Sequence, residues 1–514
     1  MKVGRFILNI KNWIKANPAE FWILVAALVV GAFFRLYRID QYMTFLGDEG
    51  RDVIIVRRIF TELHPPLIGP GTSVGGMYLG PLYYYMMAAP LLIAGFSPVG
   101  PSVMVALLGV ATIALVWWVG RAWFGKWAGI VAAGLYSISP TTIIFSRSSW
   151  NPNIMPFFAL LSIYSVWQVW RKRKFNWLIV LGISLAFVLQ SHYLGLLTIP
   201  TIFIFWLLAF RDYSAKKEAG PFIKKSVIGL ASFLVLMSPL LIFDIRHDFL
   251  NTKAIYKFIA ERRVNFSPSP ISAIPQMPEI FNLINKSLIA GKNSIAAVAS
   301  SVAIALGIVY LFIESFIKRK NFKIGAEYWL LISWFGFGLL GLGIYKQNIY
   351  DHYFGFLFPV PFLLIGIFIS KLVSKGLFAK IFGLAFLTYL IVVGLTGNPL
   401  RNDPNRLMGR SMKVSRLVLD NVDGKPFNLA VIAERNYEDG YRYFLELWGG
   451  NILRADRGDS STVSGQLIVI CENNPATCDP THSPKAEVAN FGMTKIDRQW
   501  EVEGVIIYKL VHTK

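Results

Sequence analysis

The sequence is poor in charged residues, which make up 16% of its 514 residues, and in cysteine, of which it has two. Soluble globular proteins carry about 25% charged residues. The low charged fraction, with 54% hydrophobic residues and a mean hydropathy of +0.50, therefore argues against a soluble protein. Two cysteines are too few for a disulfide-rich scaffold or a cysteine-based zinc motif. These absences indicate a polytopic membrane protein.

The charge that is present is unbalanced, with a net charge of +21. An excess of this size is also found in nucleic-acid-binding proteins, where basic residues cover one surface or helix. Here the basic residues stand in short clusters between apolar runs, which is typical of cytoplasmic loops. We therefore expect membrane lipids as partners and no nucleic acid.

About twelve apolar runs come close to the ~20 residues that a membrane-spanning helix needs. The first follows a basic stretch, as in a signal peptide, but no small-residue cleavage site comes after it. We expect an uncleaved helix with the N-terminus in the cytoplasm. The runs are Phe21–Ile39, Tyr78–Phe96, Pro101–Gly120, Trp127–Phe145, Ile154–Trp170, Trp177–Gln190, Tyr193–Phe210, Ile223–Phe243, Ser294–Phe316, Ala326–Tyr345, Phe354–Ser370 and Phe378–Gly397.

One of these runs should not span the membrane. If all twelve did, the basic loops Arg171–Lys174 and Lys318–Lys320 would face outside, against the positive-inside rule. If Tyr78–Phe96 lies along the outer surface or re-enters, every short basic loop falls inside; its Pro90 also disfavours a plain span. The expected domain, residues 1–399, has about eleven transmembrane helices, outer juxtamembrane helices and a first outer loop at residues 40–100.

The composition changes sharply after this domain, because residues 400–514 contain only short apolar runs. Leu429–Ala433, Gln466–Cys471 and Gly504–Leu510 are strand-like, and Tyr441–Trp448 is helical. The topology places this segment outside the cell as a small C-terminal α/β domain. Cys471 and Cys478 bracket a turn in an oxidising compartment, so they are a disulfide candidate; two free thiols are the alternative.

Polar residues gather at the outer ends of the predicted spans rather than at their centres. Transporters place ionisable groups near the membrane midplane, whereas these clusters describe a site at the membrane–water boundary. Each cluster alone could be a solvated helix end, and His192 and His352 could be hydrogen-bonded helix-end residues or metal ligands. The clusters are Asp48–Asp52, Ser146–Asn153, Gln190–Tyr193, Asp244–Asp248 and Tyr345–Tyr353.

The stretches GDEGRD (47–52), YLGPLYYY (78–85) and SRSSWNPN (146–153), in this order, resemble the GT-C glycosyltransferases. The resemblance is to the branch of protein O-mannosyltransferases and lipid A aminoarabinose transferases. It implies transfer of a hexose or pentose from a polyprenyl-phosphate-linked donor to an envelope glycan, glycolipid or protein acceptor. Such enzymes act at the outer face of the plasma (inner) membrane, with inversion at the anomeric carbon. The alternative function is a transporter or flippase of envelope lipids or glycans.

The resemblance also assigns roles to residues. Asp48 matches the family's first acid and is expected to be the general base, with Glu49 as its neighbouring catalytic carboxylate. Arg51 is the main candidate to bind the leaving phosphate. The other candidate donor-phosphate ligands are Arg147, Tyr83, Tyr84, His192 and His352.

Two positions depart from the family pattern. Leu79–Gly80 stands where relatives often carry lysine before the proline of the surface helix. Asn151 and Asn153 stand where relatives often carry a second aspartate, and asparagine can neither act as a base nor pair with a charge. The departure favours a mechanism without metal, although a divalent metal remains open.

The topology is testable with reporter fusions. A reporter fused after Lys174 should be cytoplasmic, and one fused at Leu400 should be extracytoplasmic, because only the proposed topology puts every short basic loop inside. Alkaline phosphatase and green fluorescent protein activities in cells report the two locations. The opposite pattern would mean that Tyr78–Phe96 spans the membrane.

Overall fold

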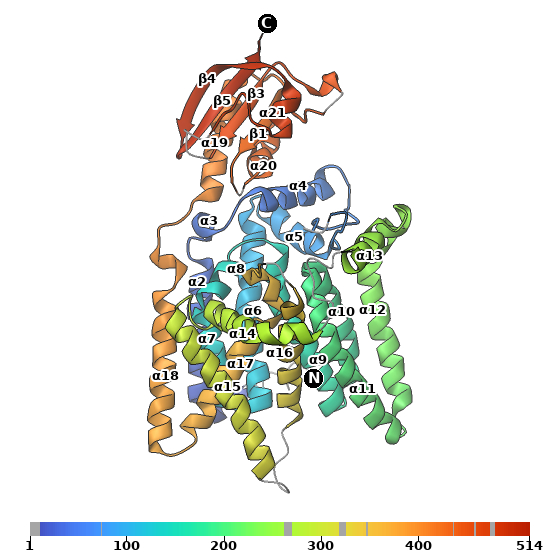
Figure 1. Ribbon diagram of the computed structural model, residues 1–514, viewed down its shortest axis with the longest axis vertical. Coiled ribbons are helices and arrows are strands. Elements are labelled where there is room, and N and C mark those ends of the chain that lie inside the picture. Colours follow the sequence, from blue (N-terminus) through green and yellow to red (C-terminus); the bar gives the residue numbers. More distant parts are fainter. Residues whose placement is uncertain are drawn as a thin grey trace.

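The computed structural model shows a bundle of helices with a small β-sheet unit next to one end of it (Figure 1), which we call the sheet end. It describes residues 11–72, 75–261, 270–317, 325–345, 348–434, 436–456, 459–472 and 478–513. The first ten residues and the predicted inner loop Lys318–Lys323 lie outside the described residues.

The apolar runs form the long helices of the bundle. Within the described residues, seven helices are long and apolar enough to cross a membrane, and a bent pair that turns by 58° makes an eighth if it is one span. The pair is η4 (Asp351–Leu357) and α17 (Pro359–Val373). The seven are α2 (Pro18–Leu36), α6 (Val99–Phe124), η2 with α11 (Tyr193–Ala215), α12 (Ala219–Arg246), α15 (Ser294–Ile317), α16 (Ala326–Ile344) and α18 (Leu377–Thr396).

Three other predicted spans form shorter or broken helices. Pro140 separates α7 (Lys126–Ile138) from α8 (Pro140–Phe145), since proline starts a new helix more readily than it continues one. The next two runs form η1 (Asn151–Ile154) with α9 (Met155–Lys172), and α10 (Trp177–Ser191). Length and composition alone do not mark these helices as spans. The count of about eleven therefore stays a prediction.

The run expected not to span forms a short helix at the sheet end. This helix, α5 (Leu82–Ile93), has 12 residues, about 18 Å at 1.5 Å per residue, which is less than the ~30 Å apolar core of a bilayer. In Figure 1 it lies with α4 (Gly47–Thr61) between the bundle and the sheet. Shorter helices connect the remaining segments: α3 (Ile39–Tyr42), α13 (Leu250–Glu261), η3 (Pro270–Gln276), α14 (Met277–Leu288) and η5 (Pro399–Arg401).

The C-terminal unit is a mixed five-stranded sheet with the order β2-β1-β3-β5-β4. Strand β1 runs parallel to β2 and β3, whereas β5 is antiparallel to β3 and β4. The elements are α19 (Leu407–Asn421), β1 (Phe427–Ile432), α20 (Asp439–Leu447), β2 (Ile452–Leu453), η6 (Ser460–Thr462), β3 (Leu467–Cys471), α21 (Ala486–Phe491), β4 (Thr494–Val502) and β5 (Val505–His512).

Helices cover both faces of this sheet, so β1 is buried along its whole length. Leu429 and Val431 pack with α19 and α20 on one face, and Ala430 and Ile432 pack with α21 on the other. This alternation follows from the two-residue period of a strand. Cys471, at the end of β3, is joined to Cys478 by a disulfide, with Cα atoms 6.3 Å apart.

Glycine allows two bundle helices to approach closely. A Cβ on Gly182 of α10 would lie 2.0 Å from the carbonyl oxygen of Gly229 in α12, and a Cβ on Gly229 would lie 2.3 Å from the carbonyl oxygen of Leu178. Small residues at such contacts are typical of membrane helices, whose association depends on close packing.

Replacing Gly182 with alanine should therefore destabilise the bundle. The added methyl group forces α10 and α12 apart, at a cost of about 1–3 kcal/mol, and lowers the unfolding temperature in detergent. Gly134→Ala in α7 is the matched control, because its Cβ would meet nothing within 4 Å and alanine favours a helix over glycine by about 1 kcal/mol. Equal unfolding temperatures for the two variants would contradict the close contact.

Candidate active site

The charged stretch at Gly47–Asp52 forms the start of α4. The Glu49 carboxylate turns back and accepts a hydrogen bond from the backbone N–H of Leu46, with Oε2 3.0 Å from N. An acid at this position satisfies a free N–H and lies at the positive end of the helix dipole. Glu49 is buried, whereas the Asp48 side chain is 44% exposed. Asp48 is therefore the more accessible acid of this pair.

Arg51 links the two aspartates of the stretch. Its Nη1 donates to Asp48 Oδ1 at 2.9 Å, and its Nε and Nη2 donate to Asp52 Oδ1 at 3.0 and 2.7 Å. The Tyr84 hydroxyl of α5 donates to the same Asp52 oxygen at 3.0 Å. Asp52 is fully buried, so this network fixes Arg51, and Arg51 fixes Asp48.

Burial perturbs the two other acids of the stretch, Glu49 and Asp52. It raises the pKa of Glu49 to about 7 and that of Asp52 to about 6, the latter against the opposing charge of Arg51. Burial also raises the pKa of Tyr84 well above its ordinary value, so that it stays a hydrogen-bond donor. Burial thus favours the neutral form of each of these three groups.

The C-terminal unit reaches the same site through the turn before α20. The Tyr437 hydroxyl donates to Asp48 Oδ1 at 2.5 Å, and Asn436 Oδ1 accepts a hydrogen bond from the Gly47 N–H at 2.9 Å. A Cβ on Gly47 would lie 2.4 Å from the Tyr437 ring, and one on Gly50 would lie 2.3 Å from the Asp439 carbonyl oxygen. The two glycines of GDEGRD thus let α4 approach the C-terminal unit.

Two cavities share Asp48 and Trp150 in their walls. The larger cavity, of about 330 Å³, is mainly apolar and is lined by Thr44, Leu46, Gly47, Asp48, Glu49, Ile144, Phe145, Ser148, Trp150, Asn153 and Tyr437. The histidine cavity, of about 240 Å³, is lined by Asp48, Arg51, Pro70, Gly71, Thr72, Leu79, Trp150, Asn151, Pro152, His192, Tyr193, His352 and Tyr353. Asp48 can therefore touch molecules in both.

The two predicted histidines meet in the histidine cavity, with ring centroids 5.7 Å apart. His192 Nδ1 accepts a hydrogen bond from the backbone N–H of Leu194 at 3.2 Å, which leaves the proton on Nε2. Burial, together with the charge of His352, lowers the pKa of His192 to about 3. His192 is therefore neutral at physiological pH and can donate a hydrogen bond, but it supplies no positive charge.

The structure places Arg147 elsewhere. Its guanidinium group donates to the carbonyl oxygens of Phe34, Tyr37 and Arg38 at 2.5, 2.7 and 3.3 Å, around the end of α2. Arg147 lines neither of the two cavities. Its guanidinium group instead holds the C-terminal end of α2 by hydrogen bonds.

Of the other predicted site residues, the two tyrosines hold neighbouring side chains by hydrogen bonds, and the two asparagines line the cavities. Tyr83 shares a hydrogen bond with Ser149 Oγ at 2.7 Å, and Tyr84 supports Asp52. Asn151 lines the histidine cavity and donates to the Ser191 carbonyl at 2.6 Å. Asn153 lines the larger cavity; its Nδ2 donates to the Ser148 carbonyl at 2.8 Å, while its Oδ1 has no hydrogen-bond partner among the described residues.

The described part of the chain contains no group of three histidine, cysteine or acidic side chains that could hold a metal ion. Glu49 is turned onto the Leu46 N–H, and Asp52 is occupied by Arg51 and Tyr84. Glu49 and the Oδ1 atom of Asp52 are thus engaged by donors of the protein itself.

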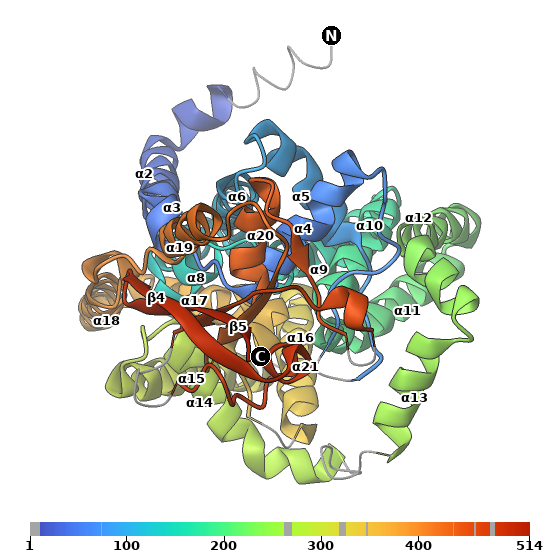
Figure 2. The ribbon, with the colours of Figure 1, turned by 90° about the horizontal axis from the view of Figure 1, so that it is seen from above.

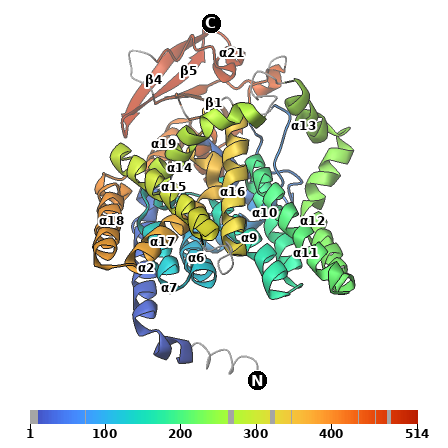
Figure 3. The same ribbon diagram turned by 60° about the horizontal axis from the view of Figure 1, so that its bottom comes forward.

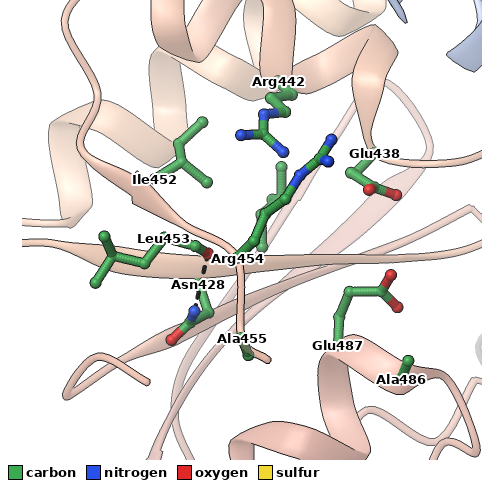
Figure 4. Close-up of a pocket in the computed structure, with 10 residues that line it drawn as sticks. Asn428, Glu438, Arg442, Ile452, Leu453, Arg454, Ala455, Ala486 and Glu487 are labelled. Carbon is green, nitrogen blue, oxygen red and sulfur yellow. Dashed lines mark hydrogen bonds between the residues drawn. The ribbon is translucent and has the colours of Figure 1, made fainter. Parts of the chain in front are cut away.

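A further cavity, of about 200 Å³, lies within the C-terminal unit (Figure 4). Arg442 and Arg454 extend into it, Glu438 and Glu487 stand at its side, and Asn428 donates to the Leu453 carbonyl at 2.8 Å in its wall. Neither Asp48 nor Arg51 lines it. Glu438 in its wall directly follows Tyr437, but the cavity shares no lining residue with the two cavities at Asp48.

Comparison with known proteins identifies the fold. Residues 79–243 match the family model described as dolichyl-phosphate-mannose-protein mannosyltransferase. The structure is similar to that of ArnT from Cupriavidus metallidurans bound to undecaprenyl phosphate, with a TM-score of 0.59 and 13% identity over 96% of this chain and 98% of that one. The chain has the GT-C fold.

Two further similarities agree with this fold. AglB from Archaeoglobus fulgidus, an oligosaccharyltransferase solved with an inhibitory peptide and a dolichol-phosphate, aligns with a TM-score of 0.53 and 11% identity over 89% of this chain and 70% of that one. "Putative mannosyltransferase YkcB" of Bacillus subtilis (strain 168) is 25% identical over 162 residues. That match covers 31% of this chain and 21% of the relative's length. Together with the apolar helices, this fold indicates a multi-pass membrane protein.

Sequence reasoning did not identify Asn436, Tyr437 or Trp150 as site residues. Trp150 lies within the polar cluster Ser146–Asn153, which is predicted to face the site without a role for Trp150 itself. Asn436 and Tyr437 follow the carboxyl end of β1, the end of a parallel strand where α/β sheets commonly place functional residues. The loop after the first buried strand was therefore the signal that could have indicated them.

The buried state of Glu49 predicts a pH-dependent stability. Because its pKa is raised in the folded protein, wild-type stability falls as the pH rises from the ordinary glutamate pKa, about 4.3, to about 7. Glu49→Gln keeps an acceptor for the Leu46 N–H and removes the buried charge. Its stability relative to wild type should increase from pH 4 to pH 8, by at most about 3 kcal/mol.

Thermal unfolding in detergent at a series of pH values measures this difference. Glu62→Gln, at the exposed end of the same helix, is the control and should show little pH dependence, since the Glu62 side chain is 58% exposed. A Glu49→Gln difference that does not change with pH would contradict the buried carboxylate.

Proposed function

We propose that the chain is a glycosyltransferase that moves a sugar from a polyprenyl-phosphate-linked donor to a hydroxyl of an envelope acceptor, at the outer face of the membrane. The observation that carries the proposal is the position of Asp48 in the walls of both cavities. A general base must reach the acceptor hydroxyl while that hydroxyl reaches the anomeric carbon of the donor. The polyprenyl phosphates bound by ArnT and AglB support this donor class.

The histidine cavity fits the donor phosphate. Arg51 has five N–H donors, and three of them are used on Asp48 and Asp52. Two therefore remain for phosphate oxygens. The neutral His192 adds one N–H donor, so the leaving phosphate would be held by hydrogen bonds and by one cation. The polyprenyl chain would lie along the apolar helices.

The larger cavity fits the acceptor. The acceptor hydroxyl gives its proton to Asp48 while its oxygen forms a bond to the anomeric carbon, and the bond from that carbon to the phosphate oxygen breaks. Attack from the face opposite the phosphate inverts the anomeric centre. Asn153 Oδ1, buried and without a partner among the described residues, is available to accept a second acceptor hydrogen bond.

Arg51 couples the two halves of the reaction. In the resting site its charge is balanced by the carboxylates of Asp48 and Asp52. When Asp48 takes the proton, its negative charge disappears, and the positive charge of Arg51 becomes available to the phosphate as it leaves. Electrostatic stabilisation that increases in the transition state is the kind that accelerates a reaction.

The buried charges of the bundle favour this function over transport. Arg35 of α2 donates to the carbonyl oxygens of Gly31 and Ser137 at 3.1 and 3.0 Å. Glu20 accepts from Arg121 at 2.8 Å. The contacts of Arg35 with Ser137 and of Glu20 with Arg121 tie helices to one another, whereas ionisable groups on a transport path face a water-filled cavity.

Asp48→Asn tests the proposal. Asparagine keeps the size and one acceptor oxygen but cannot take a proton, so sugar transfer should fall by about 10²- to 10⁴-fold. Mass spectrometry of envelope glycans and polyprenyl-phosphate sugars in cells is the measurement. The variant should accumulate the lipid-linked sugar and lose the glycan, and a deletion strain should do the same.

The control is Asp40→Asn, which changes an exposed aspartate near the end of α2. It should preserve the glycan profile, and both variants should insert and unfold like the wild type. A wild-type glycan profile in the Asp48→Asn strain would disprove the assignment of the base.

A further inference from the structure

The turn Asn436–Glu438, which we call the tyrosine turn, is anchored on both sides of the active site. On the bundle side, Asn436 Oδ1 accepts the Gly47 N–H at 2.9 Å, and the same oxygen accepts the Tyr437 N–H at 2.9 Å. One asparagine side chain thus fixes the turn to the start of α4 and orients the residue that follows it.

The second anchor is Glu472, in the sheet unit. Its Oε1 accepts from Asn436 Nδ2 at 2.5 Å and from the Tyr441 hydroxyl at 2.7 Å, and its Oε2 accepts from Arg410 at 2.8 Å. Glu472 directly follows Cys471, which is held by the disulfide to Cys478. The tyrosine turn is therefore built into the C-terminal unit by charge-assisted hydrogen bonds.

At the active site, the two groups that donate hydrogen bonds to Asp48 both bind the same carboxylate oxygen. The Tyr437 hydroxyl and the Arg51 Nη1 donate to Oδ1. Asp48 Oδ2 accepts no hydrogen bond from the described residues. The Asp48 side chain is 44% exposed, so a substrate can reach this oxygen. A carboxylate held by one oxygen presents the other in a fixed direction, as a preorganised base requires.

We propose that Tyr437 is a positioning residue of the transferase: with Arg51 it holds Oδ1 of Asp48, so that Oδ2 takes the acceptor proton, and the C-terminal unit thereby completes the active site. This inference rests on the proposed function. Burial raises the pKa of Tyr437 well above its ordinary value, so the phenol remains a donor across the physiological range.

Tyr437→Phe removes this hydrogen bond and keeps the ring against Gly47. Loss of a hydrogen bond to a charged group should lower kcat by about 10- to 100-fold, with the donor KM unchanged, because the histidine cavity does not include Tyr437. The acidic limb of the pH–rate profile should also move to higher pH, since the ionised carboxylate loses a donor. A purely structural role would not move that limb.

The measurement is sugar transfer by the purified full chain in detergent or nanodiscs, with a synthetic polyprenyl-phosphate sugar and a membrane extract as acceptor. Tyr508→Phe, in strand β5 of the same unit, is the matched control and should keep the wild-type kcat and pH profile. Asn436→Ala should lower kcat in the same direction as Tyr437→Phe. It should add little in the double variant, since both act through one contact.

The outcomes separate this inference from the proposed function. Wild-type kcat and pH profile in Tyr437→Phe, with Asp48→Asn inactive, would overturn the positioning role and leave the transferase intact. Full activity in Asp48→Asn would overturn the proposed function itself. A lower kcat in Tyr437→Phe with an unmoved acidic limb would also overturn the positioning role.

Discussion

The site depends on one buried carboxylate. Asp52 is removed from water, and a buried charge is costly unless charged and polar partners compensate it. Arg51 and Tyr84 supply those partners, so α4 must begin where it does and α5 must pack against it. With two of its nitrogens held by Asp52, Arg51 has a fixed direction in which to meet Asp48. The reactive carboxylate is positioned by one that does not react.

The same site joins two regions of very different composition. The bundle contributes the cavity walls around Trp150, His192 and His352, and the C-terminal unit contributes Tyr437. Gly47 and Gly50 allow the two regions to approach, because a side chain at Gly47 would collide with Tyr437 and one at Gly50 with the start of α20. Viewed from above, the C-terminal unit lies over the bundle, with α20 beside α4 (Figure 2). The view in Figure 3 shows the bundle helices on the side away from that unit. We propose a division into domains at residue 400, with an active site that needs both.

The sequence predicted the fold better than the site. Long apolar runs predict helices because the bilayer requires about 20 such residues, and β1, β3 and β5 were predicted because strands buried on both faces form continuous apolar runs. Strand β4, with the polar sequence TKIDRQWEV, is an exposed edge strand and gives no such signal. At the site, Asp48 and Arg147 both stand in polar clusters after a predicted span, and only contacts distinguish them: Arg147 is bound to backbone carbonyls. Tyr437 lies 389 residues from Asp48, and no local pattern can predict a contact over that distance.

The most direct test of this account is a structure of the protein with a non-transferable polyprenyl-phosphate sugar bound. The account predicts the phosphate in the histidine cavity, within hydrogen-bond distance of Arg51 and His192, and the sugar beside Trp150 with its anomeric carbon facing Asp48. A sugar phosphate bound away from Asp48, for example between Arg442 and Arg454 in the C-terminal unit, would contradict the central claim that Asp48 is the base of a glycosyl transfer.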